Sequence, residues 1–286
     1  MTLPGTDPAW GMAYTVIAHH MLDWYGDLRA VEEQYAGLVL YMRYLRNIPG
    51  VDPVVAPFTQ TELLTYNVYA DWDKPSRMPK SPAVPPSLIV PEPARGPRGQ
   101  PSPLIGSWAY ITQLRKMVDI AQALGHTADA TRFAADAAKS SKAFVEAYFR
   151  GAGTDTATFG DGSLTQMSAN ALALDLFPEA GDSAEFAAGV LSPAQREAAV
   201  SALVRGVVAA GVHSDAGIIS FSTLYPVMSS SVTAPTGSGS ASASLGTLAL
   251  AINVKTDYPS FGFELSQNAT TLWEKFEGTG GTHNHM

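Results

Sequence analysis

Four segments of the chain place an aromatic side chain beside a carboxylate where no helical pattern continues. They are residues 7–11 (DPAWG), 69–73 (YADWD), 159–163 (FGDGS) and 273–274 (WE). A sugar has apolar C–H faces and polar edges, so its site needs an aromatic plate together with side chains that hydrogen-bond hydroxyl groups. Several loops that each supply such a pair favour a carbohydrate site over a phosphate or metal site.

The pair nearest the C-terminus, Trp273 and Glu274, is followed by a glycine-rich turn and then by His283 and His285. This combination is typical of a sugar-binding pocket, and we expect Trp273 and His285 to contact the sugar. Taken alone, Glu274 has a plainer interpretation as a surface or helix-capping carboxylate. The His-x-His sequence has the spacing of metal ligands, but no third ligand is evident. We therefore expect neither a metal nor a cofactor.

The earlier pairs also offer candidates. Trp10 and Trp72 are expected to line the pocket, and Asp7 and Asp71 to reach sugar hydroxyls. Each has an alternative, because most tryptophans are core residues. Asp7 is also well placed to cap the first helix, and Asp71 to cap a turn.

The segments between these loops have a helical pattern. Residues 11–25 carry apolar side chains at spacings of three and four, and Gly26 ends the segment. Asp27 can cap a second helix over residues 28–46, which places its apolar residues on one stripe. Two helices joined by two residues make an antiparallel hairpin.

The same pattern recurs along the chain. Ser192, Pro193 and Gln195 form a helix start with a capping box ahead of a helix that runs to about residue 210. Further helices are expected over residues 106–124, 128–149, 163–176 and 242–254. Repeated helical hairpins over this length indicate an all-α toroid or solenoid, because a compact bundle needs fewer helices.

Two stretches interrupt the helices. Residues 79–103 are rich in proline, and residues 229–244 are rich in serine, glycine and alanine. Either fits an interdomain linker. Helical hairpins of the same character lie on both sides, so we expect two loops within a single domain over residues 1–286.

Composition narrows the classes of function. The chain is 46% hydrophobic and 15% charged, which is typical of a globular protein. Its net charge is −8 and its basic residues are dispersed, which argues against a nucleic-acid groove. The absence of cysteine excludes a thiol nucleophile and Cys-ligated zinc. No apolar run of about 18 residues indicates a membrane span, no signal peptide is recognisable, and the compartment stays open.

Six motifs occur in the order expected of a bacterial-type α-L-rhamnosidase, and the chain resembles the catalytic domain of glycoside hydrolase family 78 over essentially its whole length. They are residues 7–11, 69–72, 169–174 (ANALAL), 256–262 (TDYPSFG), 269–274 (ATTLWE) and 283–285 (HNH). The resemblance implies an (α/α)6 barrel and inverting hydrolysis of terminal α-L-rhamnosides. The partner it implies is a rhamnose-containing glycoside or polysaccharide.

The resemblance also implies roles for single residues. Inversion needs two carboxyl groups about 6.5–9.5 Å apart with a water molecule between the base and the sugar. The family's base matches Glu274, and Trp10, Trp72 and His285 would shape the rhamnose site. The family's acid lies in a loop upstream of the DPAWG motif, and only six residues precede Asp7 here. The family also continues past the HNH motif with further helix, so we expect a barrel that is incomplete at both ends, with little or no activity by itself.

Two other classes of function fit the same sequence less closely. One is a non-catalytic carbohydrate-binding or structural protein built on a degenerate barrel. The other is a different (α/α)6 glycosidase, such as a glucoamylase-like or trehalase-like enzyme. The combination of DPAWG with TLWE favours the rhamnosidase.

Overall fold

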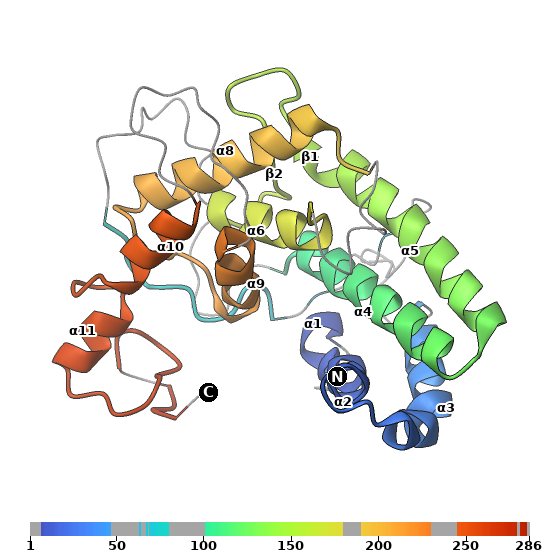
Figure 1. Ribbon diagram of the computed structural model, residues 1–286. Coiled ribbons are helices and arrows are strands. Elements are labelled where there is room, and N and C mark those ends of the chain that lie inside the picture. Colours follow the sequence, from blue (N-terminus) through green and yellow to red (C-terminus); the bar gives the residue numbers. More distant parts are fainter. Residues whose placement is uncertain are drawn as a thin grey trace. The chain divides into compact units, whose positions relative to one another are not determined.

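The computed structural model describes residues 7–46, 63, 67, 69–79, 101–179, 190–229, 245–278 and 281–284. Nearly all of its regular structure is helical, which confirms the all-α prediction (Figure 1). The elements are α1 (Pro8–Gly11), α2 (Ala13–Tyr25), α3 (Leu28–Arg46), α4 (Pro103–Ala123), α5 (Thr127–Tyr148), β1 (Phe149–Arg150), β2 (Thr158–Phe159), α6 (Gln166–Leu176), α8 (Pro193–Ala209), α9 (Ile218–Ser229), α10 (Leu245–Asn253) and α11 (Phe261–Ser266). The two predicted loops fall mostly outside the described residues.

The chain divides into two compact units. The first combines Met1–Val68, Pro101–Tyr148 and Leu176–Val190, and it holds α1 to α5. The second combines Tyr69–Gln100, Phe149–Asp175 and Leu191–Met286, and it holds the remaining elements. The prediction of a single domain over residues 1–286 stays a prediction beside this division.

The first unit is built on helical hairpins. Gly26 adopts a left-handed conformation (φ 63°) and ends α2, and the Asp27 carboxylate accepts a hydrogen bond from the Ala30 amide at 3.0 Å to start α3. These are the stop and start signals predicted from the sequence. Helices α4 and α5 form a second hairpin and lie side by side (Figure 1).

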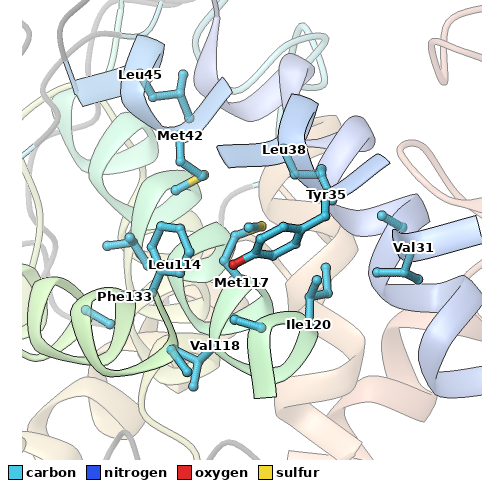
Figure 2. Packing of buried hydrophobic residues seen from close by; sticks show 14 of the residues in the cluster. Val31, Tyr35, Leu38, Met42, Leu45, Leu114, Met117, Val118, Ile120 and Phe133 are labelled. Atoms are coloured by element: carbon cyan, nitrogen blue, oxygen red, sulfur yellow. The ribbon is translucent and has the colours of Figure 1, made fainter. Parts of the chain in front are cut away.

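The core of this unit lies where α3 meets α4 and α5. Figure 2 shows one stripe of α3 packed against both helices. The stripe comprises Val31, Tyr35, Leu38, Met42 and Leu45, and it faces Leu114, Met117, Val118, Ile120 and Phe133. The spacing of three and four residues along α3 therefore buries the same face at each turn.

Helix α2 forms as predicted, but several of its large apolar residues are exposed. Ile17 is 61% exposed and Trp24 66% exposed, whereas Thr15 and Ala18 are buried. The small residues face α4, where the Thr15 hydroxyl donates to Gln113 Oε1 at 3.1 Å. Close approach to a buried neighbour explains why small residues occupy the inner face.

The second unit combines an antiparallel ribbon of two two-residue strands with helices of 6 to 17 residues. β1 pairs with β2 in the register Phe149↔Phe159, and α6 behind it is buried along most of its length. Asn170 on α6 accepts from the Phe159 amide at 3.1 Å, which ties the ribbon to the helix. The predicted capping box at Ser192 and Gln195 is present at the start of α8.

Helix α9 was not predicted from the sequence. The helix contains Pro226 and lacks the polar cap that marks other helix starts. Its first amides are held from a distant segment, because the Ile218 amide donates to Trp72 O at 2.8 Å and the Ser220 amide to Asp71 Oδ1 at 2.9 Å. A helix that is started by tertiary contacts leaves no local signal.

Candidate functional site

The segment Tyr69–Asp73 is anchored by the carboxylate of Asp71, which is 1% exposed. Its Oδ2 accepts hydrogen bonds from Ser168 Oγ at 2.8 Å, from the Gly217 amide at 3.0 Å and from Ser220 Oγ. Its Oδ1 accepts from the Ser220 amide. With this many protein donors, Asp71 fixes its loop against α6 and the start of α9.

A close backbone contact fits the same loop to α9. A Cβ atom on Gly217 would collide with Asp71 O and would lie 2.5 Å from Trp72 O. Only a residue without a side chain leaves room for the loop at this point. Trp72 is thereby held with its ring next to the C-terminal segment.

Glu274 lies beside Trp72. Glu274 Oε1 accepts from Trp72 Nε1 at 3.4 Å, and Oε2 accepts from the Thr282 amide at 2.8 Å. The Glu274 amide in turn donates to Thr282 O at 2.9 Å. The carboxylate is partly exposed and oriented by two donors, one of them long and therefore weak.

Trp273 is ordered by the same turn. Its ring stacks on His283 with centroids 4.8 Å apart, and His283 Nε2 lies 2.9 Å from Gly278 O. A Cβ atom on Gly278, which has φ 66°, would collide with the Trp273 ring. The glycine in this turn therefore allows the Trp273 ring to approach the backbone closely.

Asp73 and Lys275 form an ion pair directly beside Glu274. Lys275 Nζ lies 3.1 Å from Asp73 Oδ1, and the Asp73 side chain is 3% exposed. Burial raises the pKa of Asp73, the Lys275 ammonium lowers it, and the hydrogen bond to the Glu274 carboxyl raises it further, with a net rise. Neither Asp73 nor Lys275 was predicted from the sequence to belong to the site.

A second polar cluster consists of Glu277, Tyr258 and Ser76. Glu277 Oε1 accepts from the Tyr258 hydroxyl and from the Ser76 amide, the latter at 2.8 Å. Burial alone would raise the pKa of Glu277, but the hydrogen bonds from Ser76 and Tyr258 outweigh it and leave the pKa lowered. The cluster ties together the three segments that carry Ser76, Tyr258 and Glu277.

Glu264 is a buried carboxyl on α11. Burial raises its pKa, and a hydrogen bond from the Trp273 amide works in the opposite direction. It lines a mainly apolar hollow with Phe261, Leu265 and residues 269–272. The contact with Trp273 places α11 directly behind the Trp273–Glu274 pair.

Asp7 and Trp10 belong to the first unit. Asp7 Oδ1 accepts from the Ala9 and Trp10 amides at 2.9 and 3.2 Å, and Asp7 Oδ2 accepts from Asn67 Nδ2 at 3.1 Å. Asp7 thus caps α1, as its simpler interpretation required. Trp10 is 38% exposed and is not a core residue.

The structure therefore brings Trp72 into contact with Glu274, the chain neighbour of Trp273, and it buries Asp71, the chain neighbour of Trp72. His285 lies outside the described residues. Substrate contacts by any of these side chains remain predictions. Asp73 and Lys275 were missed, although each is the immediate chain neighbour of a predicted site residue, Trp72 or Glu274.

Within the described residues, no group of three or more His, Asp and Glu side chains has the arrangement of a metal site. Among the same residues, none of the helices combines the length and the apolar character that a membrane span requires.

Comparison with known proteins identifies a family model and several solved structures. The model, described as the bacterial alpha-L-rhamnosidase 6 hairpin glycosidase domain, matches residues 2–286. No curated protein sequence matches significantly. The structure resembles alpha-L-rhamnosidase from Dictyoglumus thermophilum, with a TM-score of 0.69, 23% identity and coverage of 98% of this chain and 26% of that one.

Two further solved structures are similar. Streptomyces avermitilis alpha-L-rhamnosidase complexed with L-rhamnose gives a TM-score of 0.59 and 19% identity, covering 91% of this chain and 19% of the other. Alpha-L-rhamnosidase from Aspergillus terreus gives a TM-score of 0.64 and 19% identity, covering 96% and 27%. The chain thus spans about a quarter of the length of these proteins or less. The prediction of the (α/α)6 fold class is confirmed.

Proposed function

This chain belongs to the bacterial alpha-L-rhamnosidase six-hairpin glycosidase domain family, and from that premise we propose that it serves in the hydrolysis of terminal α-L-rhamnosides, with Glu274 as the carboxylate that activates water. The observation that carries the proposal is the contact between Trp72 and Glu274, at 3.4 Å across 202 residues of sequence. It joins an aromatic plate to a partly exposed carboxylate, which is the combination a sugar hydrolase needs.

The hydrogen bonds of Glu274 suit a base. Both Trp72 Nε1 and the Thr282 amide are donors, and donors stabilise the ionised carboxylate. An ionised carboxylate beside the sugar can take a proton from a water molecule, which is the task of a general base. As the water oxygen bonds to the anomeric carbon, its proton passes to Glu274 and the bond to the glycosidic oxygen breaks. Attack from the opposite face inverts the configuration.

Protonation of the glycosidic oxygen requires a second carboxyl group, and we assign that role to none of the described residues. Rhamnose as the sugar is supported by the family and by the relative that was solved in complex with L-rhamnose. Trp72 and Trp273 are the rings that we expect against its apolar face.

An activated substrate isolates the step assigned to Glu274. A 2,4-dinitrophenyl α-L-rhamnoside needs little help from an acid, because its leaving group is already a stable anion. We expect hydrolysis that first yields β-L-rhamnose, detected by proton NMR. Glu274→Gln should lower the rate about 10²–10⁴-fold.

Glu277→Gln provides the matched control, because it is the same change three residues away in a carboxylate bound by Tyr258 and Ser76. Equal losses in both variants would contradict a specific role for Glu274, as would an unchanged rate in Glu274→Gln. Calorimetry with L-rhamnose tests the alternative. Binding without any hydrolysis of the activated substrate would favour a carbohydrate-binding protein.

A further inference from the structure

Two neighbouring pairs of residues face each other in the candidate site. Trp72 and Asp73 are adjacent in the chain, and so are Glu274 and Lys275. Trp72 Nε1 contacts Glu274 Oε1 at 3.4 Å, and Lys275 Nζ contacts Asp73 Oδ1 at 3.1 Å. The two cross-contacts hold both segments in register, and they place the carboxyl groups of Asp73 and Glu274 side by side.

The environment of Asp73 is unusual for a carboxylate. Its side chain is almost fully buried, and its Oδ2 is buried with no hydrogen-bond donor in the described part of the chain. Besides Lys275, the Asp73 side chain contacts the Glu274 carboxyl group. Two ionised carboxylates have only acceptors to offer each other, so this contact becomes a hydrogen bond only when one of them carries a proton.

Electrostatics favours that protonated state. Like charges in contact oppose the ionisation of both groups, and burial adds to the cost. The single cation in contact with Asp73 among the described residues, Lys275, offsets one negative charge but not two. When Asp73 and Glu274 share one proton, the two carboxyl groups together carry one negative charge. The Lys275 ammonium then balances that charge.

We propose that Asp73 is a positioning residue for Glu274: anchored by Lys275, it shares a proton with Glu274 and so sets the pH at which Glu274 is free to act on water. The catalytic consequence rests on the function proposed for Glu274, whereas the carboxyl pair itself does not. Backbone geometry contributes, because Asp73 has φ 55°, in the left-handed region that Asp tolerates better than most residues.

Several other titratable groups on the adjoining segments make contacts of their own. Glu277 and Tyr258 bind each other and Ser76. His283 stacks on Trp273 and contacts Gly278 O. Glu264 accepts from the Trp273 amide. The titration of the pair should therefore depend mainly on Lys275.

The test is a carbon-13 NMR titration of the side-chain carboxyl carbons in the intact chain. In Asp73→Asn, Glu274 should titrate about one pH unit lower than in wild type, because the neighbouring charge is gone while Lys275 remains. Reciprocally, Glu274→Gln should lower the pKa of Asp73. Lys275→Met should raise the first titration of the pair. Asp257→Asn, in an exposed carboxylate paired with His213, is the control and should leave Glu274 unchanged.

An unchanged Glu274 titration in Asp73→Asn, to within about 0.3 pH unit, would overturn the proposal, since a merely structural Asp73 would not move it. If Asp73→Asn does not fold, the Glu274→Gln and Lys275→Met titrations decide in the same way. The readout needs no turnover. If the two carboxyl groups titrate together but the rate of hydrolysis is unchanged in Glu274→Gln, only the proposed function is contradicted. If they titrate independently but the rate depends on Glu274, only the carboxyl pair is contradicted.

Discussion

Replacement of Asp71 by alanine tests whether this carboxylate is an internal anchor. Asp71 accepts from two hydroxyls and two backbone amides, all in the buried part of the second unit. The hydroxyls can turn to each other, because Ser220 Oγ already lies 2.9 Å from Ser168 Oγ. The amides of Gly217 and Ser220 have no such freedom.

The cost follows from those two amides. A buried donor left without an acceptor costs about 1–3 kcal/mol, so two give about 2–6 kcal/mol in the free energy of unfolding. Asp71→Asn should cost less, about 1–3 kcal/mol, because the remaining oxygen still serves one amide. Urea unfolding followed by tryptophan fluorescence measures both values. Asp257→Ala is the matched control, and its carboxylate, 67% exposed, should contribute no more than about 1 kcal/mol.

Two outcomes would refute this reasoning. One is an Asp71→Ala variant whose free energy of unfolding lies within about 1 kcal/mol of the wild-type value. The other is a variant of unchanged stability that has lost affinity for L-rhamnose in calorimetry. The second result would show that the Asp71 carboxylate faces the sugar, as the aromatic–carboxylate pairing first predicted.

Two further predictions concern backbone fit and pH. Gly217→Ala should destabilise the protein by about 1–3 kcal/mol or more because its methyl group meets the Asp71–Trp72 backbone, whereas Gly160→Ala, with open space around it, should melt like wild type. Burial works against a low pKa for Asp257, but the hydrogen bond from His213 outweighs it and leaves the pKa below the ordinary 3.8. This pair therefore stabilises the fold above that ordinary value and is lost as the pH falls through the lower, folded-state pKa. Acid unfolding should show a weaker pH dependence in Asp257→Asn, and an identical acid transition in both proteins would contradict it.

Local signals were enough to predict much of the fold. Gly26, Asp27 and the capping box at Ser192 each act within four residues, and the helices they delimit are present. Helix α9 was missed because Asp71 and Trp72 hold its start from more than 140 residues away. The spacing of α2 predicted a helix correctly but did not reveal which face is buried.

The candidate site, too, could be predicted only in part from the sequence. Trp72, Trp273 and Glu274 could be chosen from residue type, because aromatic rings beside carboxylates suit sugars. The pairing of Asp73 with Lys275 could not, because it depends on the register between two distant loops. Asp7 and Asp71 were recognised as polar residues of interest, yet only the structure shows that protein donors occupy their carboxylates.

The central claim is that Glu274 activates the attacking water, and rescue by azide tests it most directly. Glu274→Ala should hydrolyse 2,4-dinitrophenyl α-L-rhamnoside about 10²–10⁴-fold more slowly than wild type. Azide is a nucleophile that needs no base, so adding it should restore the rate and yield β-L-rhamnosyl azide. Hydrolysis by Glu274→Ala at the wild-type rate would contradict the claim, and so would a slow variant that azide fails to accelerate.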